Sequence, residues 1–136
     1  MKAKRFLAVM CLTVILLAGC SGENQNITST GYNKISADEA KDMMEGEYVI
    51  ILDVRSREDY QREHIPNAIP LPNDEIETCA ENVLPDKDAK ILIYCTSGKN
   101  STTATEKLIK MGYTRVYDFG GINDWHYETI KGKTGD

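Results

Sequence analysis

The sequence lacks both the ligand pattern of a metal site and the paired thiols of a dithiol redox site. Its two histidines, His64 and His126, are isolated, and its four cysteines form no Cys-x-x-Cys pair. Structural zinc sites and thioredoxin-like sites are built from such closely spaced residues. We therefore expect no metal site in this protein.

The sequence also has no apolar run long enough to cross a membrane. Its longest run, residues 6–18, directly follows the basic segment 1–5. A membrane-spanning helix needs roughly 20 such residues, whereas a shorter run behind a basic start is typical of a signal peptide. Residues 1–19 are therefore predicted to be a signal peptide rather than a membrane span.

The predicted signal peptide ends at a cysteine. Residues 17–20 read Leu-Ala-Gly-Cys, which resembles the lipobox of bacterial lipoproteins. This resemblance implies cleavage before Cys20 and lipid modification of that cysteine, so that acyl chains hold the protein at a membrane surface. We then expect a lipid-anchored protein of the cell envelope, outside the cytoplasm. The alternative is an ordinary secretory signal in which Cys20 is incidental.

Positive charge is scarce in the remaining chain. Removal of residues 1–19 takes away three basic residues and no acidic one, which changes the net charge from −5 to −8. An acidic domain has no electrostatic attraction to nucleic acid, so we exclude DNA and RNA as partners. Cys11 leaves with the signal peptide and Cys20 is lipidated, which leaves Cys79 and Cys95 as candidate thiols.

The rest of the chain is divided into a tether and one domain. Residues 20–34 hold the lipidated cysteine and a polar stretch without apolar periodicity, which predicts a flexible tether. The domain is expected at 35–136, where apolar runs alternate with helical patterns. Such alternation predicts an α/β fold with a largely parallel sheet covered on both faces.

The expected helices are 36–45, 56–63, 73–84 and 101–111, and the expected strands are 48–54, 68–71, 91–94 and 115–119. Ser36 with Glu39 has the form of a capping box, and Ser56 is expected to cap the second helix. The prolines beside 68–71 predict that this strand lies near an edge of the sheet.

One thiol lies where a strand gives way to a helix. Cys95 ends the strand 91–94, and the small residues that follow lead into a helix expected from Ser101. Unpaired N–H groups and the dipole at a helix N-terminus stabilise an anion, and Lys99 adds a positive charge nearby. These features favour a thiolate that acts as a nucleophile or an anion-binding loop. The alternative is that Cys95 is simply a small apolar residue of the core.

The loop has no arginine. Tyrosine-phosphatase-like enzymes and related arsenate reductases need Cys-x5-Arg, because the guanidinium grips the oxyanion with two hydrogen bonds. At that spacing from Cys95 the sequence has Ser101. Phosphatase chemistry is therefore not expected.

Four segments, taken together, resemble the rhodanese, or sulfurtransferase, domain. They occur in that family's order and spacing, and they are ILDVRSREDY (51–60), EHIPNAIPL (63–71), ILIYCTSGKNS (91–101) and VYDFGGINDW (116–125). The resemblance implies a central, mostly parallel five-stranded sheet with helices on both faces. It also implies sulfur transfer without a metal or organic cofactor.

The resemblance assigns the chemistry to Cys95. Its thiolate would take sulfane sulfur from thiosulfate, a persulfide or a polysulfide, and the resulting persulfide would pass the sulfur to a thiol or to cyanide. The partners would thus be a small-molecule or protein sulfur donor and a thiol acceptor. The persulfide would be held by the loop residues Thr96, Ser97, Gly98, Lys99, Asn100 and Ser101.

Supporting roles also follow from the resemblance. Asp53 is expected to brace the loops, and Arg55 either to form an ion pair or to line the entrance. His64 is expected to hold a turn by a hydrogen bond. Cys79 lies on the apolar face of its predicted helix, which indicates a buried thiol or, as the alternative, a redox partner of Cys95.

The sixth loop position departs from the family. Members of the family often have arginine at this position, whereas this chain has Asn100, which brings no charge to an anionic donor. We therefore expect donors less anionic than thiosulfate. The departure also keeps open a second function, a non-catalytic rhodanese-like module that binds a partner or senses redox state at the membrane surface.

Overall fold

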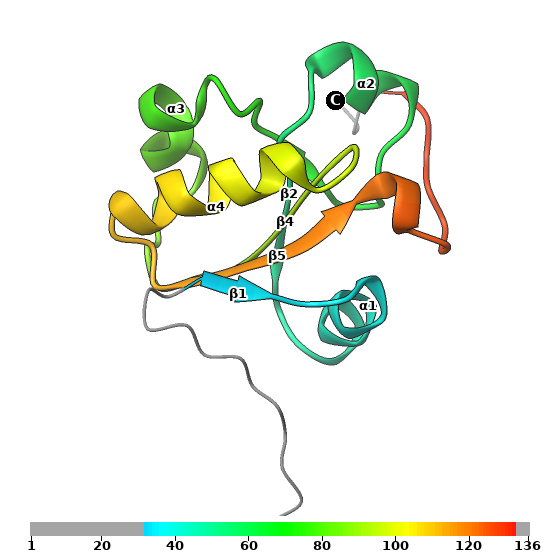
Figure 1. The fold of residues 1–136 in the computed structure, drawn as a ribbon, viewed down its shortest axis with the longest axis horizontal. Coiled ribbons are helices and arrows are strands. Elements are labelled where there is room, and N and C mark those ends of the chain that lie inside the picture. Colours follow the sequence, from blue (N-terminus) through cyan, green and yellow to red (C-terminus); the bar gives the residue numbers. More distant parts are fainter. Residues whose placement is uncertain (1–31, 133–136) are drawn as a thin grey trace, which may run out of the picture.

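The computed structural model describes residues 32–132, which form a parallel β-sheet with helices against both faces (Figure 1). The strands lie in the order β1-β5-β4-β2-β3, and every neighbouring pair is parallel. The predicted α/β fold with five strands is confirmed. The strands are β1 Tyr32–Lys34, β2 Ile50–Asp53, β3 Ile69–Pro70, β4 Lys90–Cys95 and β5 Arg115–Gly121, and the helices are α1 Ala37–Gly46, α2 Arg57–Arg62, α3 Ile76–Val83, α4 Lys99–Lys110 and the 3-10 helix Ile122–Asp124.

The central strand β4 is buried on both faces. Ile91, Ile93 and Cys95 pack into one core cluster, which includes residues of α3 and α4. Leu92 and Tyr94 pack into a second cluster, which includes residues of α1 and α2. Figure 1 shows α3 and α4 on one side of the sheet and α1 on the other. This double burial explains why the strand is a continuous apolar run instead of an alternating one.

The predicted helix starts have the expected caps. Ser36 precedes α1, and its side chain exchanges hydrogen bonds with Glu39 in a complete capping box. Ser56 precedes α2 and accepts a hydrogen bond from the Asp59 N–H at 3.2 Å. The caps satisfy N–H groups that have no partner within the helix. Both local predictions are confirmed.

Other boundaries differ from the prediction by up to three residues. Helix α3 begins late because the chain first makes a turn, in which the Glu75 N–H donates to the Pro72 carbonyl at 2.9 Å. Helix α4 begins at Lys99, two residues before the predicted start, because Gly98 is its N-cap. Strand β3 lies at an edge of the sheet, as its prolines predicted.

The predicted tether is wrong at its C-terminal end. Residues 32–34 form β1, which pairs with β5 so that Tyr32 lies opposite Val116 and Lys34 opposite Asp118. Long-range pairing, which a local polar pattern does not reveal, orders this segment. The predicted signal peptide, Cys20 and the rest of the tether lie outside the described residues. Within residues 32–132, no helix is long and apolar enough to span a bilayer.

Candidate active site

Cys95 lies at the carboxyl end of β4, beneath the loop that enters α4. Its side chain is buried, and the backbone N–H of Gly98 donates a hydrogen bond to its Sγ over 2.9 Å. The carboxyl ends of parallel strands are where α/β folds bind their ligands. The structure therefore brings the predicted thiol and the predicted loop together.

Gly98 shapes the loop around the sulfur. Its φ of +95° is in the left-handed region, which costs glycine little and other residues much more. Its Cα also faces the next chain segment, since a Cβ on Gly98 would lie 3.4 Å from the Gly120 Cα. Glycine is favoured here by the left-handed torsion, since a Cβ would make only an ordinary van der Waals contact with Gly120.

The wall opposite the loop is formed by the end of β5. Gly120 lies within β5 and has a φ of +89°, a left-handed torsion that glycine adopts at little cost, at the irregularity in the pairing of β5 with β4. Gly121 is needed for a different reason, because a Cβ there would lie 2.2 Å from the Thr96 carbonyl oxygen. That oxygen also accepts a hydrogen bond from the Asn123 N–H at 3.2 Å. The start of the Cys95 loop is thus packed directly on the end of β5.

The remaining loop residues differ in exposure. Thr96, Ser97, Lys99 and Asn100 are exposed, and the last two lie in the first turn of α4. Ser101 is buried, with its Oγ 3.0 Å from the Gly98 carbonyl oxygen and 3.3 Å from that of Gly120. The loop therefore offers the Gly98 amide, at the N-terminus of α4, to the sulfur. Its polar side chains are left available to a substrate.

Arg55 does not line an open entrance. Its guanidinium forms an ion pair with the fully buried Asp53 at 2.8 Å and also donates to the Glu63 carbonyl oxygen. Burial acts to lower the pKa of Arg55, but the hydrogen bond and charge of Asp53 outweigh it, so the pKa is raised. The pair is a buried brace between the end of β2 and the segment after α2.

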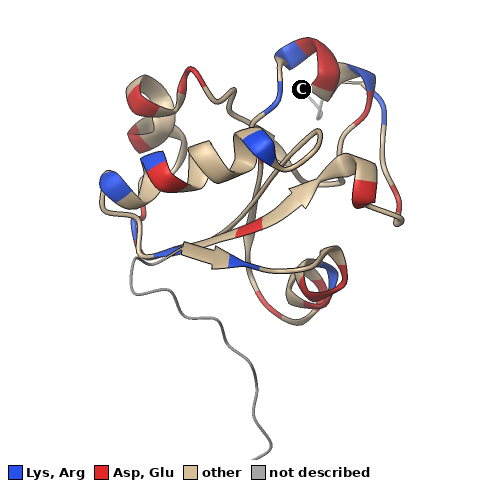
Figure 2. Ribbon diagram, in the orientation of Figure 1, with Lys and Arg blue, Asp and Glu red and all other residues tan. Residues whose placement is uncertain are grey.

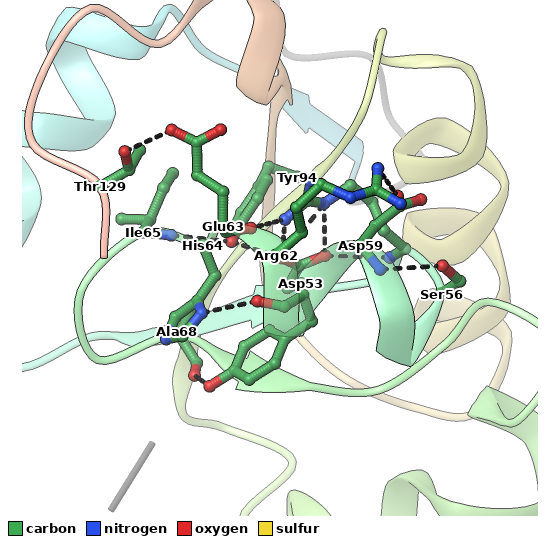
Figure 3. A network of polar contacts seen from close by, with 12 residues as sticks. Asp53, Ser56, Asp59, Arg62, Glu63, His64, Ile65, Ala68, Tyr94 and Thr129 are labelled. Carbon is green, nitrogen blue, oxygen red and sulfur yellow. Dashed lines mark hydrogen bonds and ion pairs between the residues drawn. The ribbon is translucent and has the colours of Figure 1, made fainter. Parts of the chain in front are cut away.

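Tyr94 completes this brace from β4 (Figure 3). Its hydroxyl donates to Asp53 Oδ2 at 2.6 Å and accepts from the Ile65 N–H at 3.1 Å. Burial first, and the charge of Asp53 second, raise the pKa of Tyr94. The tyrosine next to Cys95 in sequence thus points away from the thiol loop and holds the opposite face of the sheet.

His64 holds the chain after α2, which agrees with a role in the turn. Its Nδ1 lies 2.8 Å from the Tyr60 carbonyl oxygen, and its ring stacks on Tyr60. Its backbone exchanges two hydrogen bonds with Ile130, which fixes the C-terminal segment. Asn67 in the same stretch takes the left-handed conformation, with a φ of 67°.

Basic segments occur near the loop at this end of the molecule. Figure 2 shows them at the start of α4 and in α2. In α2, Arg57 is paired with Glu75, and Arg62 is paired with Asp59. Lys99, by contrast, has no ion-pair partner among residues 32–132. It is therefore the basic side chain of the loop that is free to meet an anionic substrate.

Neither a metal site nor a disulfide is found among residues 32–132. They contain no cluster of three or more His, Cys, Asp or Glu side chains suited to a metal ion. Cys79 and Cys95 are both free thiols. Cys79 is half-buried on α3 and packs against the core, as the apolar face of its helix predicted.

Most of the chain matches a known family of proteins. Residues 36–128 match the rhodanese-like domain. The chain belongs to the rhodanese-like family. This match covers the thiol loop, both core clusters and the Gly-Gly pair, and it confirms the family resemblance seen in the sequence.

Sulfurtransferases are among the curated relatives of this rhodanese-like chain. Thiosulfate sulfurtransferase PspE of Escherichia coli is 40% identical over 81 residues, which cover 60% of this chain and 78% of PspE. Thiosulfate sulfurtransferase GlpE of Coxiella burnetii is 33% identical over 101 residues, which cover 72% of this chain and 92% of GlpE. These relatives support the general assignment of this chain as a sulfurtransferase.

Solved structures of the family share the fold. A rhodanese with anions from E. coli has a TM-score of 0.59 at 38% identity, with 62% of this chain and 100% of that chain covered. A rhodanese-like domain protein from Staphylococcus aureus has a TM-score of 0.63 at 31% identity, with 75% and 99% covered. The parallel sheet and its helices are thus the architecture of the rhodanese-like family.

Three residues beside the rhodanese-like loop were missed in the sequence. They are Tyr32, Thr102 and Asp118, whose side chains contact one another, and Thr102 also contacts the Gly98 carbonyl. Asp118 could have been found locally, since an aspartate two residues before a glycine often caps that residue's N–H. Tyr32 gave no local signal, because its partners lie 70 and 86 residues away in the sequence.

Proposed function

We propose that this protein is a sulfurtransferase that carries sulfane sulfur as a persulfide on Cys95. The observation that carries the proposal is the 2.9 Å hydrogen bond from the Gly98 N–H to the Cys95 Sγ, made inside a loop that opens a helix. A hydrogen bond and a helix dipole directed at one sulfur stabilise it as an anion. An anionic sulfur is both the nucleophile and the leaving group that the reaction needs.

Two displacements make up the proposed reaction. The Cys95 thiolate attacks the outer sulfur of the donor, the new S–S bond forms, and the donor's own bond to that sulfur breaks. With thiosulfate the leaving group is sulfite, which takes the electron pair. An acceptor thiolate or cyanide then attacks the outer sulfur of the persulfide and releases the Cys95 thiolate. No external oxidant or reductant is needed.

The charges at the loop support donors that are less anionic than thiosulfate. Asn100 is exposed and uncharged, and Arg55 is engaged with Asp53. Lys99 is a point charge on a flexible stem and lacks the paired donors of a guanidinium. Protein persulfides, glutathione persulfide and polysulfides are therefore the proposed donor class.

The test is the intact mass of the full chain after incubation with glutathione persulfide, polysulfide or thiosulfate. We expect wild type to gain one sulfur mass on Cys95, faster with the first two donors than with thiosulfate. The Cys95→Ser variant should gain none at that site, and Cys79→Ser serves as the matched control that keeps the adduct. A clear preference for thiosulfate would refute the donor class.

The same experiment decides the second candidate function. If wild type forms no adduct with any donor, the chain is better described as a non-catalytic rhodanese-like module that binds a partner or senses redox state. The observation that favours this alternative is Asn100, which leaves the loop without the charge of an arginine. An adduct on Cys95 would rule out a purely non-catalytic role.

We also propose that the protein is held at a membrane surface in the cell envelope through lipid on Cys20. The support is the order of basic segment, apolar run and Leu-Ala-Gly-Cys in residues 1–20. Metabolic labelling with an alkyne fatty acid should mark the wild-type chain. A Cys20→Ser variant that is labelled equally would refute the anchor.

A further inference from the structure

A buried carboxylate lies beneath the thiol loop without a basic partner. Asp118 is fully buried on β5, and no basic side chain within residues 32–132 forms an ion pair with it. Burial of a carboxylate is costly unless hydrogen bonds satisfy its oxygens. The Gly120 N–H donates to Oδ1 at 2.9 Å and the Tyr32 hydroxyl donates to Oδ2 at 2.6 Å, and the Thr102 hydroxyl lies 3.1 Å from Oδ2.

These contacts reach both walls of the Cys95 site. Through Oδ1, Asp118 holds the Gly120 backbone, against which Gly98 packs. Through Oδ2 it holds Thr102, whose hydroxyl also lies 3.0 Å from the Gly98 carbonyl oxygen. One carboxylate therefore fixes the two segments that enclose the sulfur.

The Thr102 hydroxyl has one hydrogen and three oxygens within 3.3 Å, namely Asp118 Oδ2, the Gly98 carbonyl oxygen and the Tyr32 hydroxyl. It can donate either to Asp118 Oδ2 or to the Gly98 carbonyl, and the charged acceptor is the stronger one. The Tyr32 hydroxyl already donates to Oδ2, which weakens the attraction of that oxygen for the Thr102 hydrogen and favours its donation to Gly98. Loss of the Tyr32 hydroxyl would draw that hydrogen to Asp118 and away from the loop.

Gly98 links the Thr102 hydroxyl to the Cys95 sulfur. Its carbonyl, on the Thr102 side, and its N–H, on the Cys95 side, are separated only by its own left-handed φ and ψ torsions. The Thr102 hydroxyl, together with Ser101 Oγ at 3.0 Å, therefore holds the Gly98 carbonyl and limits how far the N–H can turn away from Sγ. Burial first, and then the hydrogen bond to Asp118, raise the pKa of Tyr32, so its hydroxyl remains a donor throughout the neutral range.

We propose that Asp118, Thr102 and Tyr32 form a positioning network that holds the Gly98 amide against Cys95, with strand β1 supplying its last member. The inference deepens the proposed sulfurtransferase function and rests on it. It gives β1 a second role: the strand adds an edge to the sheet and also brings a hydroxyl to the support of the thiol loop.

The test uses substitutions that keep the Asp118 charge, namely Tyr32→Phe and Thr102→Val in the full chain. The readout is the rate of iodoacetamide alkylation across pH, with peptide mass spectrometry to resolve Cys95 from the other cysteines. Each variant should slow Cys95 alkylation at pH 7 by roughly threefold, with the midpoint of the pH profile moved upward. The double variant should lose little more than the larger single loss, because the two residues act in one network.

Two controls separate positioning from stability. Thr102→Ser retains the hydroxyl and should restore the wild-type profile, and Tyr48→Phe changes a tyrosine that is 86% exposed and should leave the profile unchanged. If Tyr32→Phe and Thr102→Val lower the melting temperature but leave the alkylation profile unchanged, the network is structural only and the inference is wrong. Should Tyr32→Phe fail to fold, Thr102→Val against Thr102→Ser decides the question.

Alkylation needs no sulfur donor, so this test and the test of sulfur transfer fail separately. A wild-type chain that forms no persulfide would refute the sulfurtransferase proposal. The variants would still show whether the network directs the Gly98 amide at Cys95. An unchanged profile in both variants, alongside normal persulfide formation, would overturn the network and leave the function standing.

Discussion

Asn100 is the loop residue that we expect to limit which donors the exposed side of the loop can hold. Its side chain is exposed in the first turn of α4, where it can donate hydrogen bonds but adds no charge. The sequence left open whether Arg55 lines the entrance to the site. In the structure its guanidinium forms an ion pair with Asp53. The proposed nucleophile Cys95 is thus in place, and we expect the loop to bind an anionic donor weakly.

An Asn100→Arg substitution should strengthen that grip. A guanidinium can make two charge-assisted hydrogen bonds to a thiosulfate sulfonate, so we expect thiosulfate turnover to rise on the order of tenfold. Polysulfide turnover should change little, because that donor has no such group. The measurement is steady-state turnover with each donor, and Asn100→Gln is the uncharged control. An equal rise with both donors would contradict the explanation.

The loop and strand β5 fit together as elements, without a side chain between them. The contact is between backbones, with the Thr96 carbonyl against the Cα of Gly121. The loop can pack this closely on β5 only because residue 121 has no Cβ. The backbone torsions of Gly121 do not themselves require glycine, since its φ of −123° is ordinary extended backbone.

Gly121→Ala should therefore displace the start of the loop. We expect a loss of about 1–3 kcal/mol in the free energy of unfolding, together with slower persulfide formation on Cys95. Gly46→Ala is the matched control, because a Cβ there meets nothing within 4 Å and alanine favours a helix. Urea unfolding and intact-mass kinetics measure the two effects. A Gly121→Ala chain that equals wild type in both would show that the loop can move aside at no cost.

Predictions from sequence succeeded where the signal is local. The capping box at Ser36 and the thiol after an apolar strand can be identified within a few residues, and both are present. The Arg55 pairing was left open, because its choice between Asp53 and solvent depends on burial. The strand at residues 32–34 was missed, because Tyr32 forms its hydrogen bonds with residues on β5 and α4. Long-range contacts of this kind have no signature in a polar stretch.

At the scale of the whole molecule, buried tyrosines make stability depend on alkaline pH. Burial raises the pKa values of Tyr94 and Tyr113 above the ordinary value of 10.0. The unfolded chain then releases these protons near pH 10 while the folded chain holds them. Their contribution is fully present below about pH 10 and is lost as the pH rises further, with a slope of about 1.4 kcal/mol per pH unit for each proton.

The Tyr94→Phe variant tests this dependence. It should be less stable at pH 7 by about 1–3 kcal/mol, because the Ile65 N–H and Asp53 each lose a partner. Its free energy of unfolding should also fall less steeply than that of wild type between pH 10 and 11. Urea unfolding at several pH values measures both, with Tyr48→Phe as the exposed control. Parallel slopes for wild type and Tyr94→Phe would count against the assignment.

The two ends of the sheet have a consequence for how copies of this chain behave when crowded. The outer strands β1 and β3 have three and two residues, and Pro70 removes one N–H from the latter. Long, flat outer strands are templates on which a second chain can add and start an aggregate. These strands are too short to act as such templates. Dense packing of copies on a surface should therefore leave them separate and each thiol loop accessible.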